Sequence, residues 1–188
     1  MNKTLIINFV LFQIGWFACV LGGAFHQPVL GSAIALSIII FHLYNSARNR
    51  PEFDLLLLAI VIGFIFESAM VSFNLAHYSN AQFHQNIAPY WMILMWPLFA
   101  TTLNLSMRWL KKLSLVLVAL IGAVFAPIAY FAGSNLGAVV YDDTVISLSV
   151  IALAWALLFP ALVVAARRLN GYELTDASVI DAEVRQHV

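Results

Sequence analysis

One carboxyl, Glu67, stands out in this sequence because it lies inside a long apolar segment, residues 55–74. The other acidic residues and all nine Lys and Arg are expected in short connections or near the chain ends. A charged group at the centre of a bilayer costs about 2.5–3.5 kcal/mol on insertion scales, so it normally faces other helices and finds a partner there. Glu67 is therefore the one candidate for an intramembrane acid or base.

Further polar and tryptophan side chains are expected at a similar depth. Residues four or seven positions apart share one face of a helix, which places Asn74 on the face of Glu67 and Asn104 on that of Pro97. We expect a polar seam between the first, third and fourth apolar segments, with the fifth and sixth giving mostly apolar support. The candidate ligand-binding residues of this seam are Gln13, Trp16, Glu67, Asn74, Trp96 and Asn104.

Each member of the seam also has a structural explanation. Polar side chains between membrane helices contribute about 0.6 kcal/mol each and need no ligand, which would account for the amides. For Glu67 both a structural and a functional role stay open, because an intramembrane ionisable group is a functional hypothesis by default. The deep tryptophans can pack against a lipid tail or against other helices. Trp91 and Trp109 instead fit the interfacial aromatic belt.

The sequence predicts no metal site and no nucleic-acid partner. His26, His77 and His84 fall on outer connections, but no His-x-x-x-His or Glu-x-x-His pair occurs, as a histidine-based zinc site would favour. Cys19 is the single cysteine, so no intramolecular disulfide can form. Phosphate-binding loops, dinucleotide fingerprints and nucleophile elbows are absent from the sequence, and its basic residues are sparse. The cofactor, if one is used, stays open.

Composition places the chain among membrane proteins. Its residues are 63% hydrophobic and 10% charged, with a mean hydropathy of +0.92, against about 25% charged in soluble domains. A chain of 188 residues holds about six spans of about 20 residues and no soluble domain. We expect an all-α polytopic bundle of six transmembrane helices over residues 1–168 and a polar cytoplasmic tail at 169–188. The expected spans are residues 5–25, 28–44, 55–74, 89–107, 113–133 and 145–166.

The basic residues predict the orientation of this bundle. Lys and Arg in short connections are retained on the cytoplasmic side during insertion. With six spans and a cytoplasmic N-terminus, all nine Lys and Arg fall on that side. An odd number of spans would divide the set. We therefore expect both chain ends in the cytoplasm.

Residues in the first and fourth apolar segments resemble a known family. They are Asn8, Phe12, Gln13, Gly15, Trp16 and Phe17, together with Pro89, Trp91, Trp96, Phe99, Ala100, Leu103, Asn104, Ser106, Trp109 and Leu110. Over about residues 5–165 the chain resembles small proteobacterial inner-membrane proteins catalogued as a domain of unknown function. The resemblance implies the bacterial inner (cytoplasmic) membrane. It also implies a connection with lipid, through neighbouring genes for fatty-acid modification, and it assigns no catalytic residue.

Three functions follow as alternatives. The first is a lipid-binding or accessory membrane component, whose seam around Glu67 contacts membrane lipids or another membrane protein. The second is an intramembrane enzyme acting on a lipid or isoprenoid, in which Glu67 donates or accepts a proton and Gln13 or Asn104 orients the substrate. The third is a small proton-coupled transporter with Glu67 as its relay.

Overall fold

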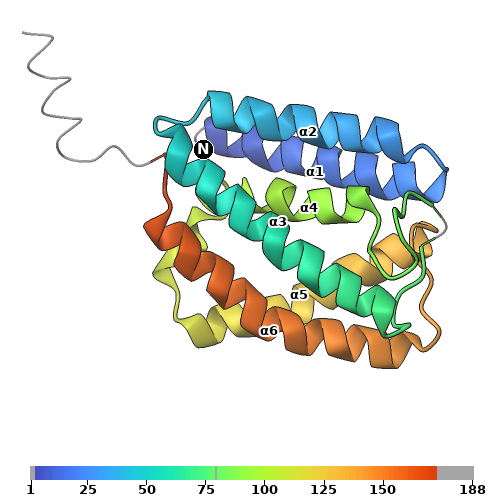
Figure 1. Ribbon diagram of the computed structural model, residues 1–188. Helices are drawn as coiled ribbons and strands as arrows, with labels where there is room; N and C mark the ends of the chain where they lie inside the picture. Colours follow the sequence, from blue (N-terminus) through green and yellow to red (C-terminus); the bar gives the residue numbers. More distant parts are fainter. Residues whose placement is uncertain (1–2, 79, 173–188) are drawn as a thin grey trace, which may run out of the picture.

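The computed structural model describes residues 3–78 and 80–172, which form six α-helices and one short 3-10 helix (Figure 1). The expected all-α fold is confirmed. In chain order the elements are α1 Lys3–Ala24, α2 Pro28–Tyr44, α3 Asn49–Ser72, α4 Tyr90–Ala100, the 3-10 helix η1 Arg108–Lys112, α5 Leu115–Asn135 and α6 Thr144–Arg168.

Four of these helices are long and apolar enough to cross a membrane. They are α1, α3, α5 and α6, with 22, 24, 21 and 25 residues, and at about 1.5 Å per residue each spans roughly the 30 Å hydrocarbon core. Large apolar side chains point outward from them, such as Val116 and Leu157, which are 72% and 75% exposed. Exposed aliphatic side chains on this scale suit contact with lipid. The chain is a multi-pass membrane protein.

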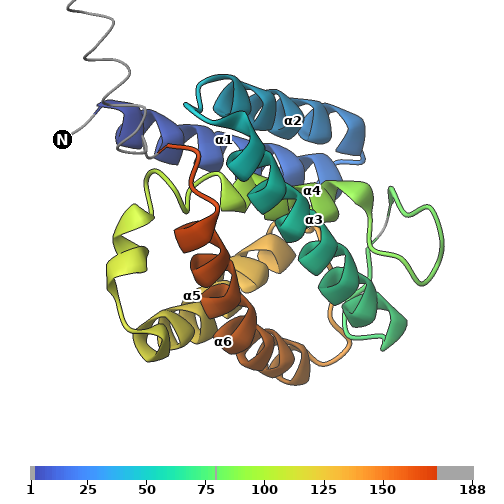
Figure 2. The ribbon, with the colours of Figure 1, turned by 60° about the vertical axis from the view of Figure 1, so that its left-hand side comes forward.

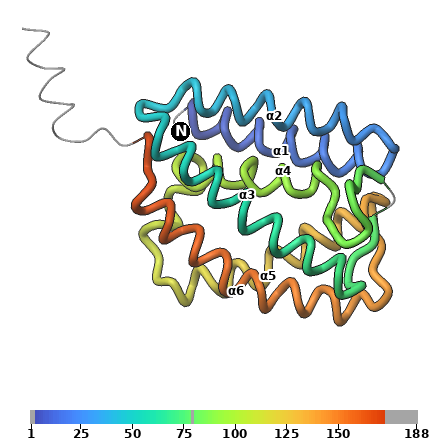
Figure 3. Tube along the Cα trace, in the orientation of Figure 1, coloured from blue at the N-terminus to red at the C-terminus, as the bar shows by residue number. Residues whose placement is uncertain are grey.

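The helices pack as neighbouring pairs, α1 with α2, α3 with α4 and α5 with α6 (Figures 1 and 2). The short helix α4 also packs against α1 and α2, so it lies among three other helices. The tube in Figure 3 shows α5 and α6 together on the side of the bundle away from α2. In the α5–α6 pair Gly122 allows close approach, because a Cβ there would lie 2.6 Å from the backbone oxygen of Trp155.

The helix expected over residues 89–107 ends early, at Ala100. Thr101 and Thr102 donate their hydroxyls to the carbonyls three residues earlier, each at 2.7 Å, and such bonds compete with the helical ladder. The irregular backbone that follows is buried, and the side chain of Asn8 bonds both the Thr101 carbonyl and the Ser106 amide. Non-helical backbone at membrane depth is tolerated where protein surrounds it in this way.

Helix α3 begins six residues earlier than the span expected from residue 55. Pro51 lies in its first turn, where the missing N–H is not needed for the helix. The helix therefore includes Glu52, which is 0% exposed. The burial of Glu52 was not predicted, because the sequence placed it in a polar, Arg- and Pro-containing connection.

Glu52 connects four parts of the chain. Its carboxyl accepts hydrogen bonds from His42 Nε2 at 2.9 Å, from Asn104 Nδ2 at 2.5 Å and from the backbone N–H of Gly171 at 2.8 Å. Lys111 donates to the oxygen of the Asn104 amide. Glu52 therefore joins α2, α3, the segment after α4 and the segment after α6.

The segment after α6 packs on the bundle as far as residue 172. Arg48 donates to the Asn170 carbonyl at 2.6 Å, and the hydroxyl of Tyr172 donates to the His42 carbonyl at 2.7 Å. A side chain on Gly171 would meet the Arg48 carbonyl oxygen at 2.3 Å, so only glycine fits there. Most of the expected tail, residues 173–188, lies outside the described residues.

Removing Glu52 should destabilise this end of the bundle. Glu52→Ala leaves buried donors without their acceptor, and each such unsatisfied group typically costs about 1–3 kcal/mol. Thermal unfolding of the detergent-purified protein measures the change as a lower apparent Tm. The matched control is Asp54→Ala in the same helix, which breaks only the exposed Arg50–Asp54 pair at 3.7 Å and should change stability by less than about 1 kcal/mol. Equal Tm values for the two variants would contradict the anchoring role.

Candidate functional site

The Glu67 carboxyl is fully buried among three aromatic hydrogen-bond donors. Trp96 Nε1 on α4 donates to Oε1 at 2.9 Å. The hydroxyl of Tyr130 on α5 donates to the same oxygen, and that of Tyr78 donates to Oε2 at 3.4 Å. Glu67 is 0% exposed, so these groups supply the partners that a membrane-embedded carboxyl needs.

Local structure brings each donor to this point. Gly63 lies one helical turn before Glu67 and leaves room for Trp96, since a Cβ at Gly63 would be 2.3 Å from Trp96 Cγ. Tyr78 follows His77, which pairs with Val140 through two backbone hydrogen bonds of 2.8 and 2.9 Å. That pairing joins the connection after α3 to the connection after α5. The hydrogen bonds to Glu67 thus depend on contacts between segments that are distant in the sequence.

Tyr78 keeps its proton in this setting. Burial above all, and then the neighbouring Glu67 charge, raise the pKa of Tyr78 well above its usual value of 10.0. A protonated phenol is a donor, and the carboxyl oxygen beside it is an acceptor. Tyr78, in the connection after α3, therefore serves as a hydrogen-bond donor to Glu67.

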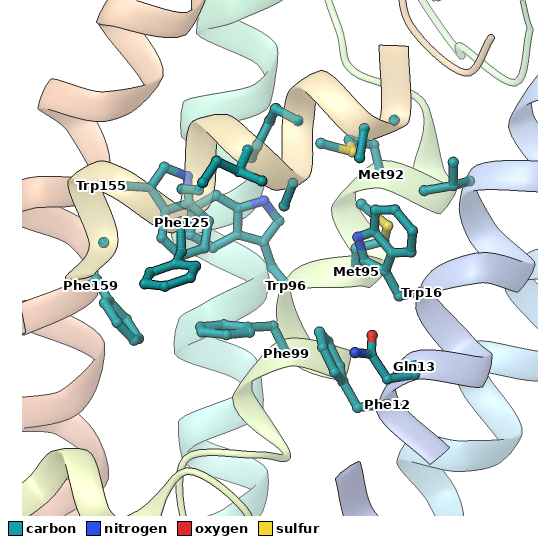
Figure 4. A pocket seen from close by; sticks show the side chains of 18 of the residues that line it. Phe12, Gln13, Trp16, Met92, Met95, Trp96, Phe99, Phe125, Trp155 and Phe159 are labelled. Atoms are coloured by element: carbon teal, nitrogen blue, oxygen red, sulfur yellow. The ribbon is translucent and has the colours of Figure 1, made fainter. Parts of the chain in front are cut away.

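Next to this cluster lies an aromatic cavity of about 640 Å³ (Figure 4). We call it the aromatic cavity and define it by the 27 residues that line it, of which 12 are aromatic and none carries a formal charge. The aromatic members are Phe12, Trp16, Phe17, Tyr78, Trp91, Trp96, Phe99, Trp109, Phe125, Tyr130, Trp155 and Phe159. This volume is within the range of about 300–1,000 Å³ typical of small-molecule sites.

All five tryptophans of the chain line the aromatic cavity. They come from α1, α4, η1 and α6, and Trp96 stacks on Trp155 with ring centroids 4.9 Å apart. The wall contributed by α5 is different, because small residues predominate there: Gly122, Ala126, Ala129, Ala132 and Gly133. Large rings on several sides and small residues on the remaining one leave the space unfilled.

The lining of the cavity includes exposed side chains on α1 and α5. Phe17 on α1 and Phe125 and Ile128 on α5 line it and are also 48%, 64% and 57% exposed. These two helices are not among the principal packed pairs.

The structure separates the six residues of the predicted seam. Gln13, Trp16 and Trp96 line the aromatic cavity, and Glu67 lies behind its wall, bonded to three of the lining residues. Asn74 is not on the helical face of Glu67, because α3 ends at Ser72; it is exposed, in a turn with a φ of +55°. Asn104 bonds Glu52 instead.

Sequence reasoning missed Tyr78, Tyr130 and Trp91 as members of this site. The sequence predicts Trp91 at the membrane interface, yet it is 2% exposed and lines the cavity. Tyr130 left one signal, since it is a tyrosine within the otherwise almost wholly apolar span 113–133. Tyr78 left none, because it reaches Glu67 only through the pairing of two loops. Helix α5 accordingly contributes a donor to Glu67, beyond the apolar support expected of it.

No group of three or more metal-binding side chains occurs within residues 3–78 and 80–172. Of the outer histidines considered from sequence, His77 pairs with Asp142, with Nε2 and Oδ2 3.1 Å apart. Both side chains are exposed. They join the two paired connections without forming a cluster of ligands.

Replacing Glu67 should distinguish hydrogen bonding from simple packing. Glu67→Leu leaves buried N–H and O–H groups unpaired, at about 1–3 kcal/mol each, so thermal unfolding in detergent should begin at a clearly lower temperature. Glu67→Gln keeps an acceptor oxygen for Trp96 and Tyr130 and should unfold close to the wild-type temperature. Should the leucine variant prove as stable as the glutamine variant, the three donors would not depend on this acceptor.

Comparison with known proteins identifies a family and no function. No curated protein and no solved structure matches the chain. A family model described as "Protein of unknown function (DUF2878)" matches residues 5–161, which is most of the chain. The resemblance noted from the sequence is thereby confirmed at the level of a domain of unknown function. This multi-pass helical protein, with its aromatic cavity beside a buried Glu67, belongs to the DUF2878 family.

Proposed function

We propose that the protein binds the apolar chain of a membrane lipid in the aromatic cavity. The observation that carries this proposal is a cavity of about 640 Å³, lined by aromatic and small apolar side chains without a formal charge, whose lining includes exposed side chains on α1 and α5. Its mouth is bordered by the exposed side chains of Phe17 and Phe125. A soluble, charged metabolite would find neither a route nor a partner there.

Shape and dispersion would have to supply the selectivity. A lipid chain entering from the bilayer leaves other hydrocarbon and not water, so the hydrophobic effect contributes little to its binding. Close contact with rigid rings contributes through many small dispersion terms of about 0.1–0.2 kcal/mol each. A cavity walled by rings that are fixed in place is suited to this task, because the rings lose little freedom when the ligand binds.

Glu67 fits a positioning role in this proposal. Its carboxyl does not line the aromatic cavity, whereas Tyr78, Trp96 and Tyr130 do. Their polar atoms bond the carboxyl. A general acid or a proton relay would need a carboxyl oxygen within reach of substrate or water, and the three donors occupy that position. The binding of a lipid therefore accounts for the geometry better than an intramembrane reaction or proton transport.

For the location we propose the bacterial inner membrane, with six spans and both ends in the cytoplasm. Support comes from the basic residues: the eight Lys and Arg among the described residues belong to the start of α1, the α2–α3 corner, η1 and the end of α6. These segments share one end of the bundle (Figure 1). Helix α4, extended by its buried irregular segment to η1, then makes the fourth crossing.

Filling the cavity should displace the lipid. Gly133 lines the cavity, and a Cβ built on it meets nothing within 4 Å, so Gly133→Leu can project into open space without a clash. We expect mass spectrometry of the purified wild-type protein to find a reproducible co-purifying lipid, and the leucine variant to lose most of it.

The matched control for this experiment is Gly133→Ala. It adds one methyl group and removes a helix-destabilising glycine, worth about 0.5–1 kcal/mol, so it should be at least as stable as the wild type and should retain the lipid. Equal amounts of lipid in the alanine and leucine variants would place the bound lipid elsewhere on the protein, and a wild-type protein without any reproducible lipid would contradict the proposal.

A reporter fused after Arg168 tests the topology. With six spans and a cytoplasmic N-terminus, the end of α6 faces the cytoplasm, so a fused alkaline phosphatase should be inactive and a fused fluorescent protein active. The same pair of reporters placed in the α5–α6 connection should give the reverse result. A periplasmic signal after Arg168 would exclude the six-span arrangement.

A further inference from the structure

The hydrogen-bonding groups in the cavity wall differ in whether they are free to meet a ligand. The polar atoms of Tyr78, Trp96 and Tyr130 bond the Glu67 carboxyl behind the wall. These three residues therefore present mainly ring surface to the cavity. A ligand must find its polar partners elsewhere in the lining.

Gln13 is such a partner. It contributes the one amide among the described residues that line the cavity, and its side chain makes no hydrogen bond within residues 3–78 and 80–172. Figure 4 shows the amide extending from α1 toward α4, beside Phe12. The indole of Trp91 also lines the cavity, but its Nε1 is buried and so does not face a ligand there.

The chemistry of the Gln13 amide restricts what it can bind. An amide offers two N–H donors and one acceptor oxygen, so an oxygen acceptor on the ligand can accept a hydrogen bond from Gln13. No Lys, Arg or His lines the cavity. An ionised carboxylate or phosphate would therefore be buried there without a counter-charge, which is strongly unfavourable.

The depth of Gln13 restricts the ligand further. Gln13 is the eleventh of the 22 residues of α1, so it lies near the middle of that span. The ester groups of ordinary phospholipids lie at the interface, roughly 15 Å from the bilayer centre. The oxygen that meets Gln13 therefore belongs to a lipid that is uncharged and can sit deep in the membrane.

From these constraints we propose that the ligand is an uncharged long-chain lipid with a carbonyl or ester oxygen, and that Gln13 determines this specificity by donating a hydrogen bond to that oxygen. The inference rests on the proposed function, because it names the class of lipid that enters the aromatic cavity. It gives Gln13 a role in recognition, separate from the positioning role of Glu67.

Quenching of tryptophan fluorescence by brominated chains tests the inference, since every tryptophan lines the cavity. The probes are methyl dibromostearate, ionised dibromostearic acid at alkaline pH and the dibrominated hydrocarbon of equal length, each titrated into protein in a non-quenching detergent. Gly133→Leu gives the background of non-saturable quenching. We expect the ester to bind about threefold to tenfold more tightly than the hydrocarbon, as one net hydrogen bond allows, and the ionised acid to bind least.

In Gln13→Met, which keeps the length of the side chain and removes the amide, the ester should bind no better than the hydrocarbon. The control Ile14→Met changes a neighbouring side chain that is 50% exposed and does not line the cavity, and it should keep the preference for the ester. Tightest binding by the ionised acid, or an ester preference that survives in Gln13→Met, would overturn the specificity. The wild-type order of the three probes tests the class of ligand even if the methionine variant does not fold. Absence of saturable quenching by all three probes would instead contradict the proposed function.

Discussion

The hydrogen bonds between Glu67 and its three aromatic donors are the interaction on which the rest of the site depends. A carboxyl that is 0% exposed must have partners, and in this chain the partners are a tryptophan and two tyrosines from three different parts of the sequence. Because their polar atoms turn toward the acid, their rings become part of the cavity wall. The cost of burying one acid is offset by an arrangement that also holds the aromatic wall in place.

Two buried acids on one helix connect the bundle at different depths. Glu52 lies in the first turn of α3 and Glu67 lies 15 residues later, about 22 Å along the helix axis. Glu52 binds the α2 end, the segment after α4 and the segment after α6, whereas Glu67 binds α4, α5 and the connection after α3. Membrane helices gain little from the hydrophobic effect when they associate. The hydrogen bonds of Glu52 and Glu67 therefore specify which segments pack against α3, which apolar contacts alone would not do.

Much of the fold could be predicted from the sequence, because length and hydropathy determine where apolar helices occur. Helices α1, α2, α5 and α6 begin and end within two residues of the expected spans. The burial of Glu67 follows from its position in an apolar segment. The early end of α4 could not be predicted, since it depends on the threonine side chains and on Asn8 from a distant helix. Glu52 was concealed by the charged residues around it.

The cavity itself left less trace in the sequence. Gln13, Trp16 and Trp96 were expected to lie together and do line one space, but periodicity says nothing about where neighbouring helices leave a gap. The small residues of α5 read only as apolar, although their size is what creates the cavity. Tyr78 could not be assigned because its place depends on the pairing of His77 with Val140. Pairing between loops is not visible in helical periodicity.

The central claim is that Glu67 fixes three aromatic side chains around a cavity that holds a lipid chain. Electron cryomicroscopy of the protein in lipid nanodiscs, with a rigid fiducial for alignment, measures this most directly. The account predicts continuous density from Glu67 to Trp96 and Tyr130, and an elongated density between α1 and α5 that no protein atom explains. A map in which these rings turn away from the acid and the side chains close the cavity would contradict it.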